Sequence, residues 1–171
     1  MPLPKPLPFS VEELMDVFLF FPTTGEIVNR CRRSNHKELE LSGGPRCSKT
    51  NDIYYWRIYY KKKEYNAHRL MYYVAYDKDP YPLYVDHINQ DTLDNRAENL
   101  RLVTIEQNNN NKRSYGNYEV MNKGIKTTCL NGEFWYQIEI EDVLYPELYD
   151  DLTDAIRTRY SLLHKYYAEN K

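Results

Sequence analysis

The most constraining feature of this chain is a polar loop between two short apolar strands. A strand is expected over residues 84–88, within PLYVDHI, and a second over 100–104, in LRLVT, with NQDTLDNRAEN between them. Thr104 and Gln107 in T-I-E-Q form a capping box, so a helix is expected to begin at Ile105. The order strand, strand, helix predicts a compact ββα unit.

This unit would bring Asp86, His87 and Asn108 within reach of one another. Cleaving a phosphodiester requires a base for water, a cation for the developing charge, and a scaffold that aligns both. The imidazole of His87, with an ordinary pKa near ~6.5, suits a general base. Asp86 and Asn108 offer hard oxygen ligands, which favour Mg²⁺ over zinc. A one-residue shift in register would move the second ligand to Asn109.

The spacing of these residues also resembles a known signature. The string Y-V-D-H-I-N-Q-D-x-L-D-N-R-x-x-N-L-R-x-V-T-x-x-x-N is similar to that of the HNH (His-Asn-Asn) homing endonucleases of phages and mobile introns. The resemblance implies that His87 is the general base and that Asp86 and Asn108 are metal ligands. It further implies that Asn99 braces the loop and orients the histidine. Arg101 would contact a phosphate.

The resemblance continues upstream and covers residues 17–112. It implies a double-stranded DNA substrate, one Mg²⁺ for which Mn²⁺ could substitute, and products with a 5′ phosphate and a 3′ hydroxyl. The family usually has Gly where Gln90 stands, so the turn after His87 can differ in geometry. For His68, packing and a phosphate contact are equally good interpretations. Further side chains expected at DNA are Arg69, Lys112 and Arg113.

The last third of the chain predicts three short strands, in GIKTT, FWYQIEI and VLYPELY, followed by an amphipathic helix over 151–167. This segment is similar to the ethylene-response-factor-type (AP2/ERF-like) DNA-binding module, in which a three-stranded sheet reads the major groove. Glu139 and Glu141 put negative charge where that family usually places basic residues. The contacts that the resemblance implies are Lys126, Trp135 and Gln137, although a core position is the more common role of such a tryptophan.

The expected fold class is therefore α+β, in two modules. Residues 1–113 form the endonuclease domain, with a ββα-metal (His-Me finger) core at about 83–112 and with 114–118 as the linker. Residues 119–171 form the AP2/ERF-like module, a small three-stranded antiparallel sheet with one C-terminal helix. On this division, removal of residues 118–171 should weaken sequence preference more than it weakens cutting.

Further elements are expected upstream of the motif. A short helix over Val11 to Phe20 is capped by Ser10, since S-V-E-E fits a capping box. A strand follows the turn at Thr24-Gly25. Residues 53–60 form a strand that turns back through a lysine run, and a helix follows over 67–76.

Composition limits the class of protein. With 171 residues and 42% apolar side chains, the chain can build a core. No apolar stretch reaches the length of a membrane helix, and MPLPKPLPFS is unlike a signal core, so a cytoplasmic location is expected, in the host if the chain is phage-encoded. Cys31, Cys47 and Cys129 form no C-x-x-C pair, which favours buried reduced thiols over disulfides or structural zinc.

The net charge of −2 is low for a nucleic-acid enzyme. Basic residues gather in the first two thirds of the chain and acidic residues in the last third, so any DNA-binding surface must be local. His36 and His164 are interpreted as structural.

Two functions remain open. One is an endonuclease that needs no evident protein partner and no membrane. Its one active site suggests nicking by a monomer, and double-strand cleavage stays possible. The alternative is a catalytically inactive DNA-binding or regulatory protein that reuses the HNH fold.

Overall fold

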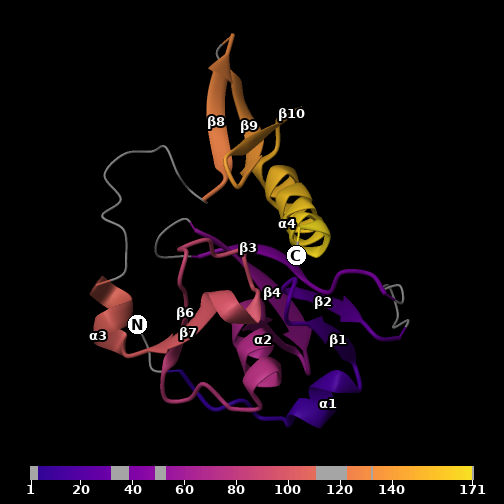
Figure 1. The fold of residues 1–171 in the computed structure, drawn as a ribbon, viewed down its shortest axis with the longest axis vertical. Coiled ribbons are helices and arrows are strands. Elements are labelled where there is room, and N and C mark those ends of the chain that lie inside the picture. Colours follow the sequence, from indigo (N-terminus) through magenta and orange to yellow (C-terminus); the bar gives the residue numbers. More distant parts are fainter. Residues whose placement is uncertain (1–3, 32–38, 49–52, 111–122, 132, 171) are drawn as a thin grey trace.

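The computed structural model describes residues 4–31, 39–48, 53–110, 123–131 and 133–170. Within these ranges the strands pair into four small antiparallel sheets, which confirms the predicted α+β class. Figure 1 shows one three-stranded sheet at one end of the molecule, with the C-terminal helix between it and the other elements.

The chain begins with α1 (Val11–Met15), β1 (Phe18–Phe21) and β2 (Glu26–Asn29). The predicted capping box is present: Glu13 N donates to Ser10 Oγ at 3.2 Å, and Ser10 N donates to Glu13 Oε2 at 3.0 Å. The prediction that this helix reaches Phe20 is wrong. Residues 18–21 pair with β2 instead, because an aromatic run gains more from burial in a strand pair than from one further helical turn.

A three-stranded sheet and a helix support the motif. Strands β3 (Gly44–Cys47), β4 (Tyr54–Tyr60) and β5 (Lys63–Asn66) form the sheet, and α2 (Ala67–Tyr76) packs on β4 and β5. The β4–β5 turn uses positive φ at Lys61 and Lys62, 45° and 64°. The predicted strand, turn and helix are all confirmed.

The predicted strand, strand, helix order is also confirmed. β6 (Tyr84–His87) pairs with β7 (Leu100–Val103) after the 3₁₀ turn η1 (Ala97–Asn99), and α3 (Ile105–Asn110) contacts both strands. The helix is capped as expected, since Gln107 N donates to Thr104 Oγ1 at 3.2 Å and Thr104 N donates to Gln107 Oε1 at 2.9 Å.

Beyond the motif, β8 (Ile125–Leu130), β9 (Glu133–Ile140) and β10 (Val143–Tyr149) form a sheet in the order β10-β9-β8, and α4 (Leu152–Glu169) follows. Asp151 caps α4 by accepting a hydrogen bond from Asp154 N at 2.9 Å. The three strands and the helix match the prediction. The predicted linker at 114–118, together with Lys112 and Arg113, lies outside the described residues.

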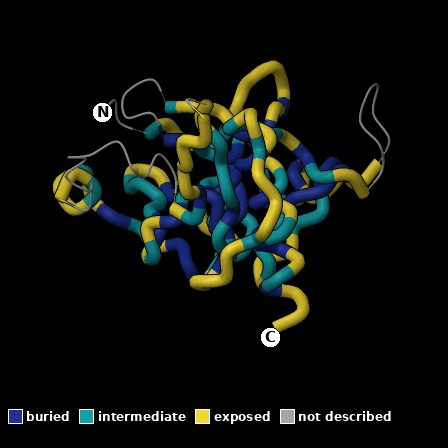
Figure 2. Tube along the Cα trace, turned by 90° about the horizontal axis from the view of Figure 1, so that it is seen from above, coloured by how far each residue is buried: buried dark blue, intermediate teal, exposed yellow. Residues whose placement is uncertain are grey.

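The C-terminal helix shares a core with the first part of the chain. Trp56 of β4 stacks on Tyr160 of α4, with ring centroids 3.7 Å apart and an interplanar angle of 6°. The guanidinium of Arg96 lies 3.5 Å from the ring centroid of Tyr167. Figure 2 shows the buried trace running through the middle of the molecule. These contacts hold α4 against β4 and against the loop of the motif.

The cysteines and His164 test two further predictions. The prediction of buried thiols is wrong, since all three cysteines are exposed. Of the residues of β8, Ile125 alone is buried, so Cys129 lies on an open part of the sheet. His164 is 1% exposed and its Nδ1 bonds to Thr24 O, as a structural role requires.

No helix in the described part of the chain has the length and apolarity needed to cross a membrane.

Candidate functional site

Asp86 and His87 are consecutive residues of β6, so their side chains leave opposite faces of the strand. Asp86 lies opposite Arg101 of β7, whose Nε and Nη2 donate to Asp86 Oδ2 at 3.0 and 2.8 Å. The Asp86 side chain is 17% exposed and that of Arg101 is 44% exposed. A carboxylate and a guanidinium therefore lie side by side at the surface of the hairpin.

His87 lies on the inner face of this hairpin and is 5% exposed. Its Nε2 is 3.1 Å from Asn95 Oδ1, and its ring meets His68 edge to face, with centroids 4.9 Å apart. Because the Asn95 oxygen can only accept, this contact favours the tautomer with the proton on Nε2 and the lone pair on Nδ1. No hydrogen bond to Nδ1 is assigned among the described residues. Sequence reasoning missed Asn95, and its place in D-N-R inside the loop was the available signal.

Burial governs the protonation of both imidazoles. It lowers the pKa of His87, while the hydrogen bond that the ring makes to Asn95 Oδ1 and the nearby carboxylates act in the opposite direction. Burial likewise lowers the pKa of His68 well below its usual range, with the proximity of His87 as the next cause. His68 is 7% exposed and also packs near Tyr55, which favours its packing interpretation over a phosphate contact.

Asn99 closes the loop that follows His87. Its Nδ2 donates to Asn89 Oδ1 at 3.0 Å and to Asp94 O at 2.8 Å, and its Oδ1 accepts from Asn89 N at 3.0 Å. These contacts join residues 89, 94 and 99 of the loop, and the bracing role expected of Asn99 stays a prediction. The direct partner of the histidine is Asn95, so any effect of Asn99 on the orientation of His87 runs through the loop.

The turn after His87 has a left-handed residue. Gln90 adopts φ of 62°, and its N–H donates to His87 O at 3.1 Å. Glycine takes this conformation most easily, and another residue there costs about 1 kcal/mol. The turn therefore has the left-handed backbone conformation that glycine favours, even though the residue at this position is Gln90.

Asn108, the second expected metal ligand, lies on α3. Its N–H donates to Thr104 O at 2.9 Å, and the helix contacts both strands of the hairpin. Asp86 and Asn108 therefore offer a carboxylate and an amide oxygen on neighbouring elements, which are ligands suited to Mg²⁺. Across the described residues no group of three or more His, Cys, Asp or Glu could hold a metal ion.

Three of the other side chains expected at DNA already have protein partners. Arg69 bonds to Lys5 O and lies 3.6 Å from Asp79 Oδ1, which ties it to the N-terminal segment. Lys126 forms an ion pair with Glu139. Gln137 Nε2 donates to Tyr145 O at 2.8 Å, within the sheet. Trp135 is half-buried.

Comparison with known proteins adds one finding. Residues 65–110, from β5 to α3, match the family model described as HNH endonuclease, and this segment contains Asp86, His87, Asn99 and Asn108. The match supports a nuclease in general, which implies DNA as substrate. No curated protein matches the chain, and no solved structure does.

Proposed function

We propose that this protein is a metal-dependent DNA endonuclease in which His87 is the general base. The observation that carries the proposal is the hydrogen bond between His87 Nε2 and Asn95 Oδ1. This contact favours the tautomer with the lone pair on Nδ1, and burial favours the neutral ring. The residue lies inside the segment that matches the HNH endonuclease model.

Each residue of the site has a defined task. Nδ1 of His87 takes the proton of the attacking water, and Asn95 holds the opposite side of the ring in place. Asp86 and Asn108 would hold one Mg²⁺, which stabilises charge on the phosphate and the leaving oxygen when bound. The exposed guanidinium of Arg101 would contact a phosphate. Cleavage then leaves a 5′ phosphate and a 3′ hydroxyl.

The C-terminal sheet is proposed to add contacts to DNA in the manner of an AP2/ERF-like module, through Lys126, Trp135 and Gln137. The ion pair of Lys126 with Glu139 lowers its contribution, because a phosphate must compete with a carboxylate. We therefore assign this sheet a role in sequence preference rather than in affinity. A phage or homing-type enzyme is the class that this combination suits best.

A second candidate is a DNA-binding protein without cleavage activity. The observation in its favour is that the His87 ring is buried and the Asp86 carboxylate is paired with Arg101. Under this alternative the hairpin would serve as a docking unit for the DNA backbone.

A plasmid assay separates the two candidates. Purified protein is incubated with supercoiled plasmid and Mg²⁺, Mn²⁺ or a chelator, and binding of the same plasmid is measured in Ca²⁺. The endonuclease produces nicked or linear DNA with Mg²⁺ or Mn²⁺ and none with the chelator. Binding without any cleavage would support the second candidate, and cleavage that persists in chelator would contradict the proposed metal site.

A further inference from the structure

We propose that Arg159, on the C-terminal helix, is a positioning residue for the loop between His87 and Asn99. Its predicted effect on cleavage depends on the proposed function, whereas its structural effect on the loop does not. The role concerns a residue more than fifty positions from the motif, outside the segment that matches the HNH endonuclease model.

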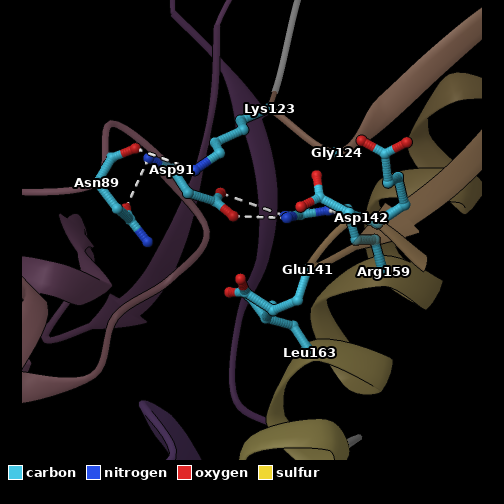
Figure 3. Close-up of a pocket in the computed structure, with 9 residues that line it drawn as sticks. Asn89, Asp91, Lys123, Gly124, Glu141, Asp142, Arg159 and Leu163 are labelled. Carbon is cyan, nitrogen blue, oxygen red and sulfur yellow. Dashed lines mark hydrogen bonds and ion pairs between the residues drawn. The ribbon is translucent and has the colours of Figure 1, made fainter. Parts of the chain in front are cut away.

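Arg159 and Asp91 form a buried, two-point ion pair. Nη1 donates to Asp91 Oδ1 at 3.2 Å and Nη2 donates to Oδ2 at 2.5 Å, and each residue is 3% exposed. Figure 3 shows the guanidinium in direct contact with the carboxylate, at a pocket that both residues line. A planar guanidinium bound at two points fixes both the distance and the orientation of its partner.

Asp91 in turn connects to the loop residues next to His87. Its N–H donates to Asn89 Oδ1 at 2.8 Å, and that oxygen also accepts from Asn99 Nδ2 at 3.0 Å. Asp91 Oδ1 accepts from Leu93 N at 3.1 Å, which holds the following turn. The path from Arg159 to Asn99 therefore consists of hydrogen bonds between buried or half-buried groups.

Arg159 is itself fixed from the C-terminal side. Its Nε donates to Glu139 O at 3.3 Å, at the end of β9. Gly124 lies so close that a Cβ there would be 2.3 Å from Arg159 Nε, and its φ is +76°. Gly124 and Glu139, both in the last third of the chain, therefore hold Arg159 in place. Arg159 in turn holds Asp91 in the loop.

The test uses Arg159→Lys in the full chain, because lysine keeps the charge and loses the two-point geometry. Arg157→Lys is the matched control, since Arg157 lies on the same helix and pairs with Asp154 at 3.4 Å while 57% exposed. Misplacing the site by about an ångström can lower the rate on the order of 10²-fold. We expect single-turnover plasmid cleavage to fall at least about tenfold in R159K, with plasmid binding in Ca²⁺ unchanged and with R157K like wild type.

A second measurement does not depend on activity. The Asn89 and Asp91 N–H groups donate within this path, so their hydrogen exchange, followed by NMR, should be about tenfold faster in R159K. Exchange at Ile138 in β9 and throughout R157K should stay unchanged. If R159K does not fold, Asp91→Asn takes its place, because it removes the carboxylate and keeps an oxygen for Leu93 N.

The outcomes are distinct. The role of Arg159 is overturned if folded R159K shows the same hydrogen-exchange rates at Asn89 and Asp91 as wild-type protein. It is also overturned if R159K cleaves plasmid at the wild-type rate. If wild-type protein itself fails to cleave, the proposed function fails, and the exchange rates still decide whether Arg159 holds the loop.

Discussion

Arg101 on β7 holds the Asp86 carboxylate on β6 through two hydrogen bonds to one oxygen, 3.0 Å from Nε and 2.8 Å from Nη2 to Oδ2. The candidate metal ligand and the candidate phosphate contact are thus neighbours across one strand pair. Bound DNA would draw Arg101 toward a phosphate and leave the carboxylate to a cation.

Replacing Arg101 should therefore weaken DNA binding uniformly. We expect Arg101→Ala to lose a similar amount of affinity for DNA of unrelated sequences. The slope of log affinity against log salt concentration should become smaller in magnitude by about one. Fluorescence anisotropy at several salt concentrations measures both quantities. Arg46→Ala, which removes an exposed, ion-paired arginine from β3, is the control. An unchanged salt dependence in R101A would exclude the phosphate contact.

Asn95 should matter for rate and not for affinity. Loss of its oxygen in Asn95→Ala frees the His87 ring to adopt the other tautomer, so we expect single-turnover cleavage to fall on the order of 10²-fold. Asn95→Asp keeps an acceptor for Nε2–H and should retain more of the rate. Imidazole ¹⁵N shifts report the tautomer directly. Full activity in folded N95A would show that Asn95 does not orient the base.

Two neighbouring asparagines allow a direct test of the second metal ligand. Asn108→Ala should raise the Mg²⁺ concentration needed for half-maximal cleavage on the order of tenfold, since one oxygen donor is lost. Asn109→Ala, one residue further along the same exposed helix, should leave it unchanged. A Mg²⁺ titration of plasmid cleavage compares them. The reverse result would move the ligand to Asn109.

The buried His164 should make the protein sensitive to acid. Burial lowers its pKa from 6.5 to about 4. The second proton would go to Nε2, which has no hydrogen-bond partner among the described residues. Between pH 6.5 and about pH 4, His164 binds more protons in the unfolded state than in the folded state. The free energy of unfolding therefore falls as the pH drops through this range. Below about pH 4, His164 contributes no further loss of stability. The loss amounts to about 3 kcal/mol at most.

His164→Asn tests this contribution, because an amide can still donate to Thr24 O but does not titrate. Urea denaturation at pH 7 and near pH 4 should show a smaller acid loss in the variant than in wild type. His68 and His87, whose pKa values are also lowered, contribute in the same direction in both proteins, so the difference isolates His164. Equal losses would contradict the pKa assignment.

The elements that local signals specify were predictable. The T-I-E-Q box and the short apolar strands around a polar loop placed β6, β7 and α3, and the amphipathic pattern placed α4. The residues that hold the site together were not predictable, because they join distant segments. Trp56 on Tyr160 and Asp91 on Arg159 have no local signature, and the strand at Phe18 depends on its partner β2.

These contacts change the expectation for a truncated chain. Removal of residues 118–171 would uncover Trp56 and leave Asp91 as a buried charge without its partner. Cutting and folding should therefore suffer along with sequence preference. The sequence pattern suggested separable modules because it shows where helices begin and end, and gives no information about which surfaces they cover.

His87→Ala tests the central claim most directly. Single-turnover cleavage of supercoiled plasmid in Mg²⁺ is compared between wild type and variant, with binding to the same plasmid measured in Ca²⁺. The expected result is loss of at least about 10²-fold in rate with binding unchanged, since the variant lacks the proton acceptor and keeps the phosphate contacts. Equal cleavage by the two folded proteins would contradict the assignment of His87 as the general base.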